Sequence, residues 1–183
     1  MKKRVNGFFL KNRRGQIWVE TVIYTLIAFA LIGLVLAFAK PKLEEIQDEG
    51  LIKQSIKVIE DIDVIIRNIG DAGNQRVLEL GISKGTLNID GIDDKIFFAI
   101  ESRGAYSQPG EDVEVGNLVV RTEEVGDLND VTLTRDFSSS YDITYAGNNE
   151  LKELGAASTP YRLLIKNEGI ILGRTHIDLE VIN

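Results

Sequence analysis

The 183-residue sequence contains no cysteine, a single histidine and only three prolines. Without cysteine the chain has no disulfide framework, no thiol redox chemistry and no thiolate metal site. It also lacks an Asn-x-Ser/Thr sequon, so sequon-directed N-glycosylation is not expected. These absences exclude the disulfide-stapled secreted scaffolds and the thiol-dependent enzymes.

Catalytic signatures are scarce as well. The only histidine, His176, lies in an alternating stretch that places it on the polar face of a strand, which favours a solvated side chain over a catalytic one. No G-x-S-x-G motif accompanies it. The acidic segment 90–94 lacks the spacing of a calcium loop, so a solvated turn is favoured over a calcium site. We therefore expect no enzyme, no metal site and no cofactor.

Acidic residues are missing from the N-terminus, where six basic residues and no acidic one precede Gly15. These cations are Lys2, Lys3, Arg4, Lys11, Arg13 and Arg14. Without them, 15 of the 21 basic residues would face 28 acidic ones, and the formal charge would change from -7 to -13. Such an acidic chain opposes binding to nucleic acid or to anionic lipid and favours solubility outside the cell.

A long apolar run follows these cations. Residues 21–39 carry no charged side chain, and the segment measures 23 residues when counted from Ile17. A helix of that length rises through about 30 Å, the thickness of the hydrocarbon core of a bilayer. We predict a transmembrane helix over residues 17–39, with the basic N-terminus in the cytoplasm and the remaining chain outside the cell.

Glu20 is the one charged residue of that helix. A carboxylate in a membrane-spanning segment costs roughly 2.5–3.5 kcal/mol on insertion scales, so such a residue usually has a partner and a function. If the chain is cut after Gly15, Gln16 acquires an α-amine four residues from Glu20, on the same helical face. The ammonium and the carboxylate then lower each other's cost in lipid.

This pattern resembles the N-terminus of archaeal type IV pilin-like proteins with a class III signal peptide. The resemblance covers residues 11–45 and implies a leader, residues 1–15, with Arg13 and Arg14 as the basic residues next to the cut and cleavage between Gly15 and Gln16. It implies that Glu20 pairs with an N-terminal amine of its own or a neighbouring subunit and sets the register of a filament. The implied partners are a prepilin peptidase, a pilus assembly ATPase with its membrane platform, and other pilin-like subunits.

Other processing and other functions are compatible with these residues. Residues 37–39 form an A-x-A pattern that a secretory signal peptidase could cut, although the apolar run is longer than usual and Glu20 interrupts its start. An uncut signal anchor is the third outcome. The alternative function is a membrane-tethered extracellular binding module that does not polymerise. The sequence does not separate a major pilin from a minor one or from an archaellum component.

Past the membrane segment the helical period continues to Gly70. Apolar residues recur there at mostly three- and four-residue steps: Leu43, Ile46, Ile52, Ile56, Ile59, Ile62, Ile66 and Ile69. We predict an amphipathic, extracellular half of the helix over residues 40–69, kinked by Pro41 just outside the membrane. Its opposite face carries the predicted i,i+4 ion pairs Lys57–Asp61 and Asp63–Arg67.

From residue 70 onward the apolar period changes to two, which indicates strands. The predicted strands cover residues 76–83, 86–90, 95–102, 117–123, 130–135, 141–145, 161–166 and 170–182. We expect the last two to form a hairpin that turns at residues 167–169, and residues 147–159 to be a loop. The chain is thus predicted to be α+β: residues 16–69 form one long helix, and residues 70–183 form an extracellular antiparallel β-sandwich or meander.

Overall fold

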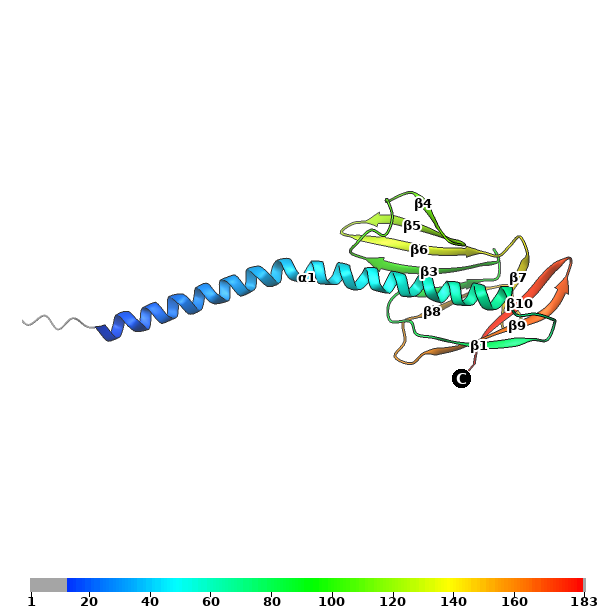
Figure 1. Ribbon diagram of the computed structural model, residues 1–183, viewed down its shortest axis with the longest axis horizontal. Helices are drawn as coiled ribbons and strands as arrows, with labels where there is room; N and C mark the ends of the chain where they lie inside the picture. The colour runs from blue at the N-terminus through cyan, green and yellow to red at the C-terminus, as the bar shows by residue number, and fades with distance from the viewer. Residues whose placement is uncertain (1–12, 183) are drawn as a thin grey trace, which may run out of the picture. The chain divides into compact units, whose positions relative to one another are not determined.

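The computed structural model describes the backbone of residues 13–182 and the side chains of residues 18–182. Within them, one helix, α1 (Arg13–Arg67), precedes ten strands (Figure 1). The strands are β1 (Gln75–Leu80), β2 (Thr86–Asp90), β3 (Lys95–Ser102), β4 (Asp112–Val115), β5 (Leu118–Val125), β6 (Leu128–Asp136), β7 (Tyr141–Tyr145), β8 (Leu151–Gly155), β9 (Tyr161–Ile171) and β10 (Arg174–Ile182). The predicted α+β class, a long N-terminal helix followed by a β-sandwich, is confirmed.

The chain divides into two compact units, Met1–Leu43 and Glu44–Asn183. The second unit contains both the later turns of α1 and all ten strands, so this part of the helix belongs to the same folded body as the sheets. Pro41, which was predicted to kink the helix, lies inside the helical span.

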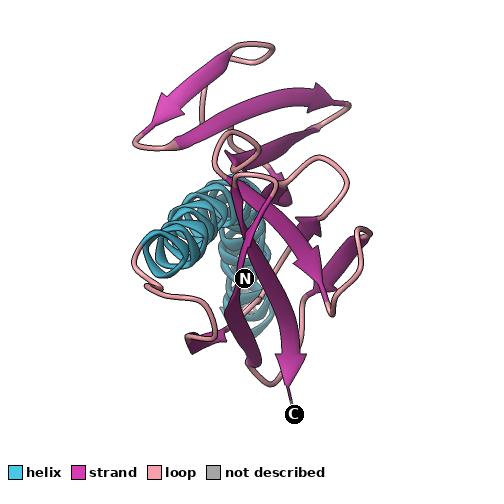
Figure 2. Ribbon diagram, turned by 90° about the vertical axis from the view of Figure 1, so that its right-hand side faces the viewer, coloured by secondary structure: helices cyan, strands magenta, loops and turns pink. Residues whose placement is uncertain are grey.

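Two sheets make up the β-sandwich. One has four strands in the order β1-β9-β10-β7, and the other has six in the order β4-β5-β6-β3-β2-β8. The pairings are antiparallel, as predicted, except that β10 pairs with β7 in parallel. Figure 2 views this unit from the end at which α1 finishes and shows the helix end-on with strands above and beside it, and residues of α1 and of both sheets belong to one cluster of buried residues. The two sheets and α1 therefore share one core.

The apolar stripe of α1 forms the centre of that core. Six isoleucines of the helix and the residues just after it are at most 8% exposed: Ile52, Ile56, Ile59, Ile62, Ile66 and Ile69. Inward-facing residues of both sheets, such as Leu133 and Ile165, complete it. The stripe was predicted to begin earlier, but Leu43 and Ile46 are more than half exposed. At that level the helix meets the strands through polar residues, since Glu44 pairs with Arg103.

Three strands, β2, β3 and β7, have the predicted bounds, whereas two strands were missed. β8 lies inside the predicted loop 147–159, and β4 lies in a segment to which no strand was assigned. Both are edge strands. β4 alternates, but over only four residues that are mostly exposed, and the two leucines of β8 are three residues apart, which breaks the alternation that identifies a strand in a sequence.

The predicted turn at residues 167–169 is wrong. β9 continues through these residues, and the hairpin turns instead at Leu172 and Gly173. Asn167 is buried, and its side-chain amide donates to the carbonyl of Gly70 at 2.7 Å. That tertiary hydrogen bond holds the Asn-Glu-Gly sequence within the strand, and the pairing shifts register opposite it, between His176 and Ile177.

Candidate functional site

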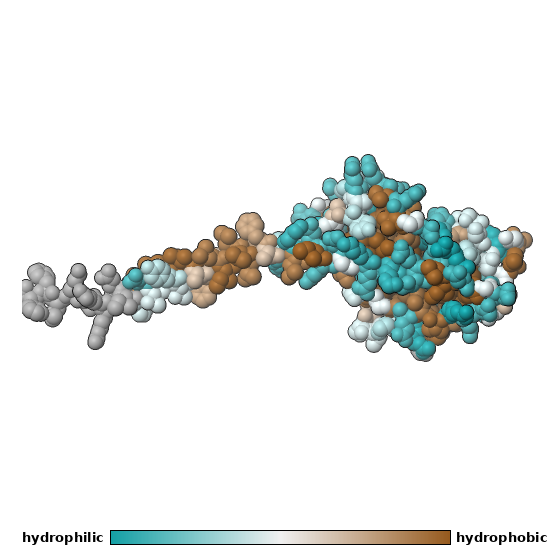
Figure 3. Space-filling model, viewed as in Figure 1, coloured by the Kyte–Doolittle hydropathy of each residue, from teal (hydrophilic) through white to brown (hydrophobic). Residues whose placement is uncertain are grey.

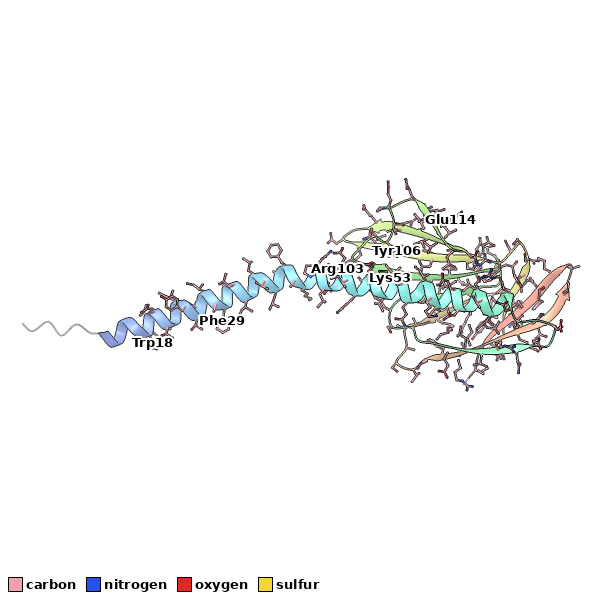
Figure 4. All side chains as sticks on the ribbon, in the orientation of Figure 1. Trp18, Phe29, Lys53, Arg103, Tyr106 and Glu114 are labelled. Atoms are coloured by element: carbon pink, nitrogen blue, oxygen red, sulfur yellow. The ribbon has the colours of Figure 1, made fainter. Side chains whose placement is uncertain are left out.

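The described part of the first unit is a helix whose apolar surface is uncovered. Residues 18–43 are all exposed, including Trp18 at 71% and Phe29 at 66%. Figure 3 shows the apolar residues of this segment in brown, and Figure 4 shows Trp18 and Phe29 on α1. Water-soluble surfaces rarely carry so large an apolar area without a partner. Within the described residues, α1 is the one helix long and apolar enough to cross a membrane.

The polar groups of this apolar segment find partners along their own helix. The hydroxyl of Tyr24 donates a hydrogen bond to Oε1 of Glu20 at 3.2 Å, across one helical turn. The hydroxyl of Thr25 donates to the carbonyl of Thr21 at 2.8 Å. Lipid offers no hydrogen bonds, so such internal pairing is what a segment needs in order to remain in a bilayer.

The predicted processing site lies at the start of α1. Residues 1–12 of the predicted leader lie outside the described residues. Arg13, Arg14, Gly15 and Gln16 are helical in their backbone, and their side chains also lie outside what is described. Cleavage after Gly15, and pairing of the Gln16 amine with Glu20, therefore stay predictions.

We expect the Tyr24–Glu20 hydrogen bond to favour insertion of the helix into a membrane. Tyr24→Phe keeps the ring and removes the donor, which we expect to cost about 1 kcal/mol, since hydrogen bonds between polar side chains in membranes are worth about 0.6–2 kcal/mol. The ratio of inserted to non-inserted chains should fall roughly fivefold. A translocation assay measures it, with the apolar segment shortened until half of the chains insert.

The control for Tyr24→Phe is the same substitution in a Glu20→Leu chain. Without the carboxylate the hydroxyl has no acceptor at position 20, so removing it should leave insertion unchanged or improved. An equal loss in both backgrounds would contradict the pairing, because it would trace the effect to the ring or to the helix in general.

In the second unit, a buried carboxylate fixes α1 to the larger sheet. Asp63 is 4% exposed in its side chain and accepts a hydrogen bond from Nε of Arg135, on β6, at 2.7 Å. It also pairs with Arg67 at 2.9 Å and accepts from the Asn117 amide at 3.2 Å. The predicted Asp63–Arg67 pair is present, but its carboxylate faces the sheet rather than solvent.

Asp48 makes a second polar connection of this kind near the start of the unit. Its Oδ1 accepts from Nζ of Lys84 at 2.5 Å, and its Oδ2 accepts from the backbone N–H of Arg103 at 2.9 Å. Asp48 is 6% exposed, so these partners compensate the burial of its charge. Asp48 and Asp63 together fix the rotation of α1 on the sheet.

His176 is half-buried, not solvated as predicted. Its Nε2 lies 3.1 Å from Oγ1 of Thr144. Its Nδ1 lies 2.9 Å from Oδ2 of Asp142, without the alignment that a hydrogen bond needs. The order carboxylate, imidazole, hydroxyl is that of a nucleophilic triad. However, Thr144 is 2% exposed and donates its proton to Asp178 at 2.7 Å, so its hydroxyl has neither access to a substrate nor a free proton.

The acidic segment 90–94 forms a turn, as predicted, but it is not solvated throughout. Oδ1 of Asp90 accepts from the backbone N–H groups two and three residues on, at 2.9 and 3.2 Å. Asp94 is buried; it accepts from the N–H of Ile143 at 2.8 Å and pairs with Arg174, whose pKa this hydrogen bond raises. Among the described residues, no group of three acidic or histidine side chains is placed to hold a metal ion.

Comparisons with known proteins assign no family. No family model matches the chain, and searches of curated proteins and of solved structures give no match. The buried polar clusters of the second unit already have partners inside the fold. The uncovered apolar helix that carries Glu20 is thus the feature that most requires a function.

Proposed function

We propose that the chain is a type IV pilin-like surface subunit of the archaeal kind. Its leader is removed after Gly15, its apolar helix anchors it in the membrane with the β-sandwich outside the cell, and copies assemble through that helix into a filament. The observation that carries the proposal is the wholly exposed helix of residues 18–43 with Glu20 near its start. The partners are a prepilin peptidase, an assembly ATPase with its membrane platform, and sibling subunits.

Assembly exchanges contacts with lipid for contacts between helices. Lipid tails are as apolar as leucine, so this exchange gains little from the hydrophobic effect and depends on close packing and polar pairing. We assign this polar pairing to Glu20 and the amine of Gln16, in the same or an adjacent copy. Because an unpaired charge in the helix bundle costs several kcal/mol, Glu20 admits one register among the many that apolar packing alone would tolerate.

The N-terminus of the membrane-extracted protein tests this proposal. We expect intact mass and N-terminal sequencing to find that the chain begins at Gln16. A start at Lys40 would instead mean signal-peptidase cleavage and a released domain, and a start at Met1 would mean an uncut anchor. Both would contradict a pilin-like subunit.

A matched control tests whether cleavage before Gln16 depends on the small residue Gly15. In Gly15→Leu, a bulky side chain replaces the smallest one at the cleaved bond, and we expect the leader to be retained. The chain should then begin at Met1 while the protein remains in the membrane fraction. Unchanged cleavage in this variant would show that the cut does not depend on Gly15.

A further inference from the structure

The turn between β9 and β10 exposes three consecutive aliphatic side chains. Ile170 is 75% exposed, Ile171 is 50% exposed and Leu172 is fully exposed. Leu172 and Gly173 both have positive φ, 52° and 85°, as a two-residue hairpin turn of type I′ requires. Asn, Asp or Gly normally occupies the first of these positions, because a larger side chain is strained there.

Leucine at this position does not serve the fold of the single chain. An exposed Asn or Gly would relieve the backbone strain, and it would also avoid placing an apolar side chain in water. Strained residues and clustered exposed apolar residues are both features of contact sites. The tip, residues 170–172, therefore has the features of a contact site whose apolar side chains are buried by a partner.

A pocket of matching size lies elsewhere on the same unit. Ile52, Ala105 and Tyr106 form its apolar wall, Glu45 and Glu49 contribute to its polar rim, and its volume is about 130 Å³. A cavity of about 150 Å³ holds one benzene molecule, so this pocket admits one leucine side chain. Figure 4 labels Tyr106, from the loop after β3, near the part of α1 that carries Lys53.

The tip and the pocket lie at opposite ends of the second unit. The pocket adjoins the first turns that α1 contributes to this unit, at residues 45–52. The tip projects at the end where α1 finishes (Figure 1), and the Asn167–Gly70 hydrogen bond connects its strand β9 to the residues just after α1. About four helical turns separate Ile52 from Arg67. A tip therefore cannot reach the pocket of its own chain.

We propose that the tip of one copy inserts Leu172 into the Tyr106 pocket of the next copy. Such a contact uses two different surfaces, so it joins subunits head to tail and repeats without closing into a dimer. The inference rests on the proposed function, because parallel helices that assemble with an axial stagger bring the tip of one copy to the level of the pocket of another and hold the two at high effective concentration. A lipid surface is a poorer occupant, since the 28 acidic residues of the chain outnumber its 21 basic ones.

The absence of cysteine makes the contact directly testable by cross-linking. Ile170→Cys, which leaves the Leu172 anchor in place, and Ala105→Cys are introduced together into the full-length chain, and intact cells are oxidised before denaturing electrophoresis. We expect a ladder of covalent oligomers, because each chain offers one tip and one pocket. Each single variant should give nothing larger than a dimer.

The matched control moves the tip cysteine to another hairpin. Ile92 is 70% exposed in the turn between β2 and β3, at the same end as the tip, since Asp94 of that turn pairs with Arg174. Ile92→Cys with Ala105→Cys therefore tests random proximity. We expect its ladder to be at least tenfold weaker. Equal ladders would overturn the proposed contact. Filaments without an Ile170→Cys/Ala105→Cys ladder would also overturn it while leaving the filament function intact, and the absence of filaments from the unmodified protein would overturn both.

A second variant separates docking from folding. Leu172→Asn suits the left-handed conformation, so the midpoint of thermal unfolding of the detergent-solubilised chain should stay the same or rise. The yield of filaments should nevertheless fall several-fold, because the anchor is lost. A lower midpoint would assign Leu172 a structural role, and an unchanged filament yield would show that the tip does not dock; each result would overturn the proposal.

Discussion

Replacing Asp63 with alanine is expected to destabilise the β-sandwich unit by about 3 kcal/mol. The substitution leaves the guanidinium of Arg135 without its carboxylate at a site that is largely withdrawn from water. Loss of one member of a buried ion pair costs about 3–5 kcal/mol, and the lower end applies here because Arg135 keeps 21% of its side chain exposed. Urea unfolding of the detergent-solubilised chain, followed by circular dichroism, measures this change.

The control for Asp63→Ala is available two residues earlier on the same helix. Asp61 pairs with Lys57 at 3.0 Å with the same i,i+4 spacing, but both side chains are well exposed. Asp61→Ala should cost no more than about 0.5 kcal/mol, because water already solvates both charges. Similar losses for the two variants would show that burial and the connection to β6 contribute nothing beyond an ordinary helical ion pair.

The contrast between these two aspartates also marks how far the sequence predicts the fold. The spacing of both ion pairs and the isoleucine stripe follow from a local 3.6-residue period, and the structure confirms them. The burial of Asp63 does not follow, because its decisive partner, Arg135, is 72 residues away and is brought to it by the packing of β6 on α1. Local patterns identify elements, and distant partners decide which polar residues face the core.

Two strands and the position of one turn were not predicted, for a related reason. β2, β3 and β7 each contain two or more buried residues, whereas β4 has none and β8 has one, and these two form strands by hydrogen-bonding to β5 and β2. The Asn-Glu-Gly sequence at residues 167–169 favours a turn, but the tertiary hydrogen bond from Asn167 to Gly70 keeps it within β9. The displaced turn is what exposes residues 170–172, so the proposed docking tip could not be predicted from the sequence.

The candidate site was easier to predict, because its residues are close together in the sequence and lie on one helix. The apolar run and Glu20 are adjacent in sequence and require no tertiary contact to be recognised. The Tyr24 hydrogen bond to Glu20 could also have been predicted, since the two residues are four apart on one helical face. The half-buried position of His176 could not, because it depends on the parallel pairing of β10 with β7.

Glu20→Leu is expected to abolish filament assembly while leaving export and folding intact. The substitution removes a carboxylate that costs roughly 2.5–3.5 kcal/mol in the membrane, so insertion should not suffer. In the proposed helix bundle, however, it would leave the ammonium of a Gln16 N-terminus without a counter-charge. A penalty of about 3 kcal/mol at each interface corresponds to more than a hundredfold loss of affinity, and it recurs for every subunit added. The measurement is the ratio of sheared filament to membrane-bound subunit.

Thr25→Leu is the matched control for Glu20→Leu, because it places the same side chain on the same apolar helix. The hydroxyl of Thr25 bonds the carbonyl of Thr21 in its own helix, and its loss leaves no charge unpaired. Filament yield should therefore stay within about twofold of the unmodified protein, a free-energy change below 0.5 kcal/mol. If Glu20→Leu behaved in the same way, the charge pair would have no part in assembly. The anchored β-sandwich would then be better explained as a membrane-tethered binding module.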